Sequence, residues 1–117
     1  MSKPEELRDR TKAFAVRMVK LFRALPKTGE AQVLGKQVLR CGTSVAANYR
    51  AVCRARSRAE FVARIGIVVE EADETVFWLE LLVDSAVIPA KRMNGLLSEA
   101  RELTAIFTAS QRTARGK

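Results

Sequence analysis

The acidic run EEADE places four carboxylates close together, at Glu70, Glu71, Asp73 and Glu74. Clustered carboxylates can act as general acids and bases or hold a pair of metal ions. In helical bundles that bind two metals, however, the inward glutamates are accompanied by Glu-x-x-His pairs, and this chain contains no histidine. The apolar periodicity also places these acids away from the predicted inner face. We therefore expect no enzymatic activity, no metal site and no cofactor.

A basic stripe is the second feature whose residues could bind a ligand. Residues 1–64 contain 15 Lys and Arg against 5 Asp and Glu, a net charge of +10, whereas residues 65–117 have a net charge of −2. Such a surface suits phosphate polymers, an acidic protein or an anionic membrane; a merely solvated face is the alternative. On one helix, positions 36 to 54 would span about 27 Å. The candidate contacts for nucleic acid or a partner are Lys36, Arg40, Arg50, Arg54, Arg56 and Arg58.

Between the arginines of this stripe the chain is built from small residues, in RCGTSVAANYR at positions 40–50. A saddle of small side chains, Gly42, Thr43, Ser44, Ala46 and Ala47, would let another helix approach closely. Asn48 follows at the rim of the predicted inner face. A buried Asn in a helical seam must find hydrogen-bond partners and can fix register and assembly state. A position at the solvent edge is the alternative for Asn48.

The two cysteines, Cys41 and Cys53, fall on one predicted helix. Their separation along that helix is about 18 Å, too far for a disulfide between them. We expect both to be small buried thiols, with an intersubunit disulfide as the alternative. Without histidine, two separated cysteines do not predict a zinc site.

The elements that must position these residues are helices. Helical periodicity runs through nearly the whole chain, and no alternating apolar run is bounded by turn pairs. Pro4, Pro26 and Pro89 mark helix starts and an end, and Ser57 with Glu60 forms a capping-box pattern. The predicted helices cover residues 5–25, 30–56, 58–85 and 89–109, and residues 110–117 should form a frayed tail.

Short connections between four long helices favour an up-down-up-down antiparallel four-helix bundle, an all-α fold in a single domain over residues 1–117. No apolar run approaches the roughly 18–20 residues needed to cross a bilayer. The charged N-terminal segment lacks the apolar centre of a secretory signal. We therefore expect a cytoplasmic protein without a membrane role.

The third predicted helix has more apolar residues than one face can hold. Ile67, Phe77, Trp78 and Leu81 fall opposite the core stripe, and acids lie among them. Soluble monomers seldom expose such a patch, so we expect a homo-oligomer with this face as the subunit interface; a broad core with Trp78 tucked beside the second helix is the alternative. The predicted interface residues are Ile67, Glu71, Glu74, Phe77, Trp78 and Leu81.

Two motifs carry a resemblance to a known family. Arg40, Ser44, Val45 and Asn48, in the pattern R-x-x-x-S-V-x-x-N, resemble the second-helix signature of the bacterial four-helix-bundle proteins known as 23S rRNA-intervening-sequence proteins. The segment NYRAVCRARSRAEFVARIGIVVEEADETVFWLELL resembles their central block, and the likeness spans roughly residues 10–107. Many members continue after the Asn with Ile-Ala-Glu-Gly, whereas Tyr-Arg-Ala follows here, so any role of that glutamate is not carried over.

The resemblance implies a homopentamer of four-helix bundles from a bacterium, with no enzymatic activity attached to the family. The accessory variability proteins of diversity-generating retroelements are similar, and their basic barrel engages a reverse transcriptase and nucleic acid. Two hypotheses follow. The first is a non-enzymatic oligomer that binds RNA or DNA through its basic surface. The second is a protein scaffold or accessory subunit, for example for a reverse transcriptase or other polymerase, without direct nucleic-acid recognition.

Overall fold

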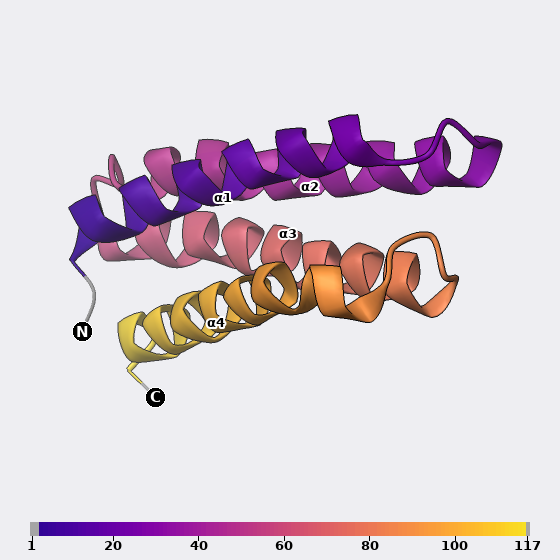
Figure 1. Ribbon diagram of the computed structural model, residues 1–117. Helices are drawn as coiled ribbons and strands as arrows, with labels where there is room; N and C mark the ends of the chain where they lie inside the picture. The colour runs from indigo at the N-terminus through magenta and orange to yellow at the C-terminus, as the bar shows by residue number, and fades with distance from the viewer. Residues whose placement is uncertain (1–2, 117) are drawn as a thin grey trace.

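The computed structural model describes residues 3–116, and four helices make up almost all of this part of the chain. They are α1 (Pro4–Ala24), α2 (Gly29–Val52), α3 (Arg58–Asp84) and α4 (Ala90–Ala114), with no strand among the described residues. The chain reverses at each connection, so that α1 and α2 form one layer over α3 and α4, and the start of α1 and the end of α4 lie at the same end (Figure 1). The rod measures 45 × 21 × 20 Å. The predicted all-α fold with four helices is thus confirmed.

Each helix begins and ends where the local sequence can satisfy its free backbone groups. Pro4 stands in the first turn of α1, where its missing N–H is no loss. The Thr28 hydroxyl accepts the Ala31 N–H at 3.4 Å to cap α2, and the Ser57 hydroxyl accepts the Glu60 N–H at 3.0 Å to cap α3. At the other end of α3, Ala86 adopts a left-handed backbone with φ of 61°.

The core lies where the predicted inner faces of the four helices meet. Its largest fully buried side chains include Phe14, Met18, Ile65, Leu79, Met93, Leu103 and Phe107. Consecutive helices pack along their length, and no comparable backbone packing joins α1 to α4 among the described residues. A side-chain clamp connects those two helices instead. Arg10 on α1 donates Nε to Glu99 at 3.0 Å and Nη2 to the other oxygen of the same carboxylate at 2.7 Å, while Glu102 lies 3.0 Å away.

Two helix ends differ from the prediction by more than one residue. Helix α2 was expected to reach Arg56 but ends at Val52, because the reversal into α3 needs several residues of chain and residues 53–55 form tight turns. Helix α4 was expected to end at 109 but continues to Ala114, so the prediction of a frayed tail is wrong for residues 110–114. The reason is a cap from another helix, since Arg58 Nε donates to the carbonyl of Ala114. The remainder of that tail includes Lys117, which lies outside the described residues.

Glycines on α2 explain part of the small-residue saddle. A Cβ atom at Gly42 would overlap Met18 Cγ of α1 and lie 2.7 Å from its Sδ atom. One heptad earlier, a Cβ atom at Gly35 would overlap Leu25 Cδ1 and approach Phe22 Cδ1 to 3.1 Å. These two positions let α1 approach α2 closely within one chain, so the helix that the saddle receives at Gly42 is α1.

Candidate nucleic-acid interface

A groove of about 590 Å³ runs between the first half of α1 and the second half of α2. Three cations, Arg8, Lys12 and Arg50, line it, and Asp9 is its one acidic residue. None of these cations forms an ion pair within residues 3–116. The rest of its lining is small: Thr43, Ala46 and Ala47. The groove therefore combines free positive charge with a floor low enough for a ligand to approach the backbone of α2.

The floor of the groove shows what the other saddle residues do. Thr43 donates its hydroxyl to the carbonyl of Leu39 at 2.6 Å, so its methyl group and the two alanines form an unobstructed surface. Asn48 is half-buried on α2 but is not part of the groove lining, and its Nδ2 donates to the carbonyl of Ser44, one turn earlier on α2, at 2.9 Å. The structure thus gives Asn48 a partner on its own helix, and its role in fixing register stays a prediction.

The six predicted contact residues do not share one environment. Arg40 forms ion pairs with Glu71 at 3.7 Å and Glu74 at 2.5 Å on α3. Arg58 caps α4, and Arg56 lies 3.8 Å from Glu60. Lys36, Arg50 and Arg54 are exposed and unpaired among the described residues, and of the six only Arg50 lines the groove.

Two residues of the groove, Arg8 and Lys12 on α1, were not predicted from the sequence. Their spacing of four residues places them on one face of α1, and both are exposed. That spacing was a usable signal, but only the packing of α1 against α2 shows that this face meets Arg50.

Comparison with known families now identifies the chain's relatives. The family of 23S rRNA-intervening sequence proteins matches residues 5–109. The chain belongs to this family. A solved structure is similar over 91% of this chain and 98% of its own, with 34% identity and a TM-score of 0.84; it is a protein of unknown function from the S23 ribosomal protein family of Bacteroides thetaiotaomicron. No functionally curated protein matches. The resemblance noted in the sequence is therefore confirmed at the level of the family and the fold.

In this member of the family, the outer face of α3 divides into two parts. Trp78 is half-buried, and its indole N–H donates to Glu74 at 3.0 Å, while Glu74 also pairs with Arg40 of α2. The hydrogen bond from Trp78 and the charge of Arg40 both hold the pKa of the Glu74 carboxyl below its usual range. Trp78 therefore lies beside α2, as the alternative interpretation expected.

Two other apolar side chains on this face remain in solvent. Phe77 is 53% exposed and packs edge-on against Trp78, with ring centroids 5.0 Å apart, and Ile67 is 48% exposed. Leu81 is partly buried. Glu71 is also partly buried, and its Oε2 atom is shielded from solvent without a hydrogen bond from any described residue. Of the predicted interface residues, Ile67 and Phe77 are thus exposed apolar side chains. Trp78 and Glu74 instead contribute to the contact between α3 and α2.

The cysteines differ from each other. Both are free, and Cys41 is buried as expected, with burial raising the pKa of its thiol. Cys53 is exposed, so the expectation of two buried thiols is wrong for this residue. It lies just beyond the last turn of α2, where the chain turns away from the core towards α3.

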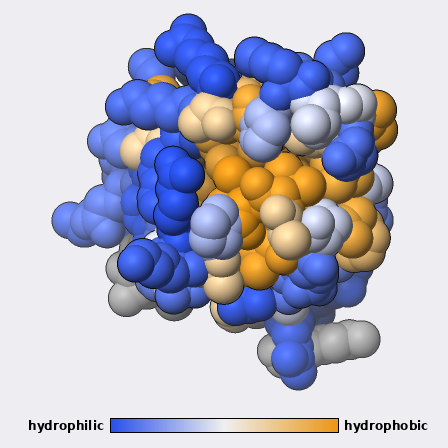
Figure 2. Space-filling model, turned by 45° about the vertical axis from the view of Figure 1, so that its right-hand side comes forward, coloured by the Kyte–Doolittle hydropathy of each residue, from blue (hydrophilic) through white to orange (hydrophobic). Residues whose placement is uncertain are grey.

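No group of three or more metal-binding side chains occurs in the part of the chain that the structure describes. Among the same residues, no helix has the length and apolar character that spanning a membrane requires. On the face that Figure 2 shows, hydrophobic side chains gather in one patch ringed by hydrophilic ones. A groove between α1 and α4 is lined by Arg17, Lys20, Leu21, Ala24, Ile88, Arg92 and Leu96.

Proposed function

We propose that this protein is a non-enzymatic nucleic-acid-binding protein and that a strand of RNA or DNA lies in the α1–α2 groove. The observation that carries this proposal is the convergence of Arg8, Lys12 and Arg50 from two helices on one groove, where none of the three forms an ion pair with another described residue. Phosphates are the anions that repeat along a strand and match such a line of cations. Asp9, also in the groove, reduces but does not cancel the local positive charge.

The small floor of the groove supports the same proposal. With Thr43, Ala46 and Ala47 below, a sugar–phosphate backbone can approach α2 while the long side chains of Arg8 and Arg50 reach it from the sides. Binding of this kind is driven by release of counterions and weakens steeply as salt is added. It also places little demand on base sequence, because phosphate contacts position a strand without reading it.

The salt dependence of binding tests the proposal. For a single strand, each phosphate contact contributes about 0.7 to the slope of log K against log salt concentration. Arg50→Gln should therefore weaken binding of single-stranded RNA and flatten this slope by about 0.7, and adding Lys12→Gln should flatten it by a similar amount again. Lys91→Gln is the matched control, because Lys91 is an exposed cation on α4 outside the groove. Filter binding over a salt series gives both quantities.

Two results would contradict the groove as the binding site. One is the absence of any retained RNA or DNA with the unaltered protein at low salt. The other is a slope that changes equally for Arg50→Gln and for Lys91→Gln, since the charge would then act without regard to position.

We also propose that the protein associates with copies of itself through the outer face of α3; the family resemblance implies five copies. Support comes from Ile67 and Phe77, which a lone chain leaves about half exposed. Phe77→Ser should shift the mass measured by light scattering towards the monomer. Val33→Ser is the control, since Val33 is 62% exposed but lies on α2. A monomeric unaltered protein at micromolar concentration would refute self-association.

A protein partner is the second candidate function, and the hydrophobic patch on the face shown in Figure 2 favours it. The α1–α4 groove adds apolar side chains such as Leu21 and Ile88, flanked by Arg17, Lys20 and Arg92. This chemistry suits a partner segment with apolar and acidic residues. Isolation of one stoichiometric protein partner, free of nucleic acid and released by Arg92→Glu, would favour this function over strand binding.

A further inference from the structure

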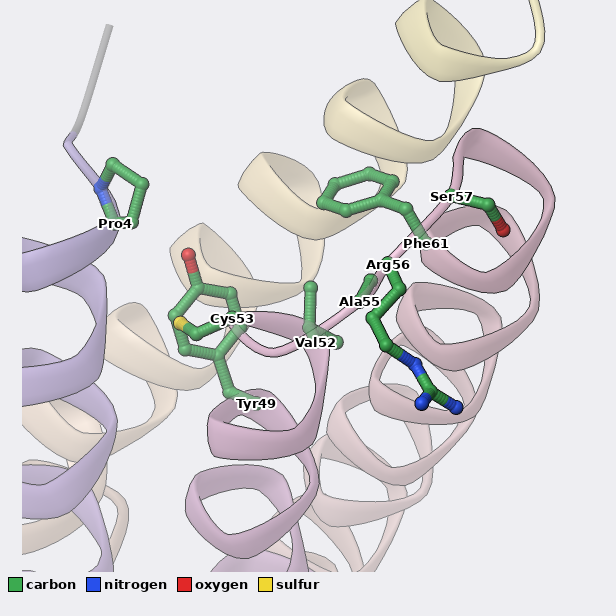
Figure 3. A pocket seen from close by; sticks show the side chains of 8 residues that line it. All are labelled: Pro4, Tyr49, Val52, Cys53, Ala55, Arg56, Ser57 and Phe61. Carbon is green, nitrogen blue, oxygen red and sulfur yellow. The ribbon is translucent and has the colours of Figure 1, made fainter.

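A second pocket, of about 450 Å³, opens at the corner where α2 turns into α3. Its lining comes from the start of α1, the last turn of α2 and the first turn of α3: Pro4, Tyr49, Val52, Cys53, Ala55, Arg56, Ser57 and Phe61. Figure 3 shows the ring of Phe61 on one side and Pro4 on the other, with Tyr49 and Cys53 between them. The guanidinium group of Arg56 points away from this space, so the side chains that face it are mostly apolar.

Two aromatic residues give the pocket its chemistry. Phe61 is only partly buried, so a face or edge of its ring is available to a ligand. Tyr49 is 5% exposed, and its ring packs against Phe107 with centroids 5.3 Å apart, which fixes the position of its hydroxyl. Burial raises the pKa of Tyr49 to about 12, so the hydroxyl keeps its proton at neutral pH. The Cys53 thiol, a weak hydrogen-bonding group, is the polar neighbour of this hydroxyl.

The pocket is adjacent to the basic groove. Both are bounded by the first two turns of α1 and the last turns of α2, with Arg8 and Arg50 in the groove and Pro4 and Cys53 in the pocket. Along α2, the distance from Thr43 in the groove to Cys53 in the pocket is about 15 Å by helical rise. The exposed side chain of Arg54 lies at the same corner of the fold. A strand whose phosphates follow the groove therefore reaches an apolar pocket in which the Tyr49 hydroxyl is held in place as a hydrogen-bond donor.

We infer that this corner pocket receives an unpaired base of the strand whose phosphates follow the α1–α2 groove. The inference rests on the proposed function and narrows its ligand from nucleic acid in general to single strands or loops. A base stacks on an aromatic ring whatever its identity, and its edge offers acceptors for a tyrosine hydroxyl. In a duplex the bases are stacked and paired with each other, so they cannot enter such a pocket without being extruded.

Substitution of Phe61 tests the inference by fluorescence anisotropy with a labelled single-stranded RNA and with its duplex. Phe61→Leu keeps an apolar side chain and removes the ring; it should weaken single-strand binding roughly 5- to 150-fold, the range for the loss of one base stack, and leave duplex binding unchanged. Phe61→Tyr keeps a ring and should bind like the unaltered protein. Phe22→Leu is the matched control, because Phe22 is also a partly buried ring but lies on α1 outside the pocket.

Protection of Cys53 from alkylation gives a second readout at the pocket itself. Cys53 is exposed and Cys41 is buried, so iodoacetamide should modify Cys53 in the folded protein. Single-stranded RNA should slow this reaction several-fold, and Phe61→Leu should remove most of that protection at an equal RNA concentration.

The outcomes separate this inference from the proposed function. If Phe61→Leu binds single strands as the unaltered protein does, or if Cys53 is not protected, the pocket is not a base site although the groove can still bind phosphates. If the unaltered protein binds single strand and duplex equally, the inference is also wrong. If it binds neither, the proposed function fails and the inference fails with it.

Discussion

Gly42 offers a direct test of why α2 is built from small residues. In Gly42→Ala the new Cβ atom would overlap Met18 Cγ and lie 2.7 Å from Sδ, and Met18 is fully buried, so it has little room to move. In Gly95→Ala the nearest atom to the new Cβ would be Arg17 Nη2 at 3.5 Å, which is an ordinary contact. Both glycines lie inside helices. The two substitutions thus differ mainly in the space that surrounds the added methyl group.

The expected magnitude follows from two terms. Replacing Gly by Ala within a helix stabilises by about 1 kcal/mol through helix propensity, and this term applies to both sites. Overpacking of a tightly filled core costs about 1–3 kcal/mol. Gly95→Ala should therefore raise the free energy of unfolding. The free energy of unfolding of Gly42→Ala should be about 1–3 kcal/mol lower than that of Gly95→Ala.

Urea denaturation followed by circular dichroism, at equal protein concentrations, measures this difference. Shortening Met18 in the background of Gly42→Ala should recover part of the loss, because it removes the atoms that the methyl group meets. If Gly42→Ala stabilises the protein as much as Gly95→Ala does, the close contact between α1 and α2 at this point is not real, and the saddle is then free to receive a helix from another chain.

The remaining predictions concern charge and backbone. Arg10→Gln should lower the free energy of unfolding by about 1.5–3 kcal/mol, because it breaks a partly buried two-point bond to Glu99; Arg101→Gln, which breaks an exposed pair, should cost less than about 1 kcal/mol. The Arg10 guanidinium holds the pKa of Glu99 below its usual range, so the stability from this pair is present above about pH 4.3 and is lost as pH falls through the lower folded-state pKa; because the pKa of Glu74 is lowered as well, urea titrations at stepped pH should show a smaller loss of stability in Arg10→Gln than in the unaltered protein. Ala86→Gly should stabilise by about 1 kcal/mol, since φ at this position is 61°, a value that glycine adopts without strain; an unchanged or lower midpoint in urea would count against that strain.

Much of the fold could be predicted because the apolar pattern repeats at helical spacing along the whole chain. Helical spacing by itself places positions such as Phe14, Val45, Leu79 and Phe107 on inner faces, and all are buried. The helix ends were less certain, since an end can depend on a residue far away in sequence. The continuation of α4 to Ala114 depends on Arg58, which only the folded bundle brings to that carbonyl.

The candidate site could be predicted only in part, because periodicity shows which face a cation occupies but not what lies opposite. Arg40 and Arg58 lie on exposed positions and were assigned to ligand binding, yet one pairs with acids of α3 and the other caps α4. Arg8 and Lys12 were overlooked, although they complete the groove with Arg50. The subunit contact expected for Trp78 stays a prediction; within the chain, its indole N–H donates to Glu74 of the same helix.

The different environments of Arg40 and Arg50 have one physical origin, the antiparallel register of α2 and α3. Arg40 lies opposite the part of α3 that holds Glu71 and Glu74, and it is neutralised there. Ten residues further along α2, the facing part of α3 instead carries Arg64, which donates to the carbonyl of Ala51 at 2.7 Å and pairs with Glu60 at 2.9 Å. The nearby acid is therefore already paired, and Arg50 keeps its charge for the groove. The position of the acidic run on α3 thus decides which half of the basic stripe stabilises the bundle and which half is free to bind a ligand.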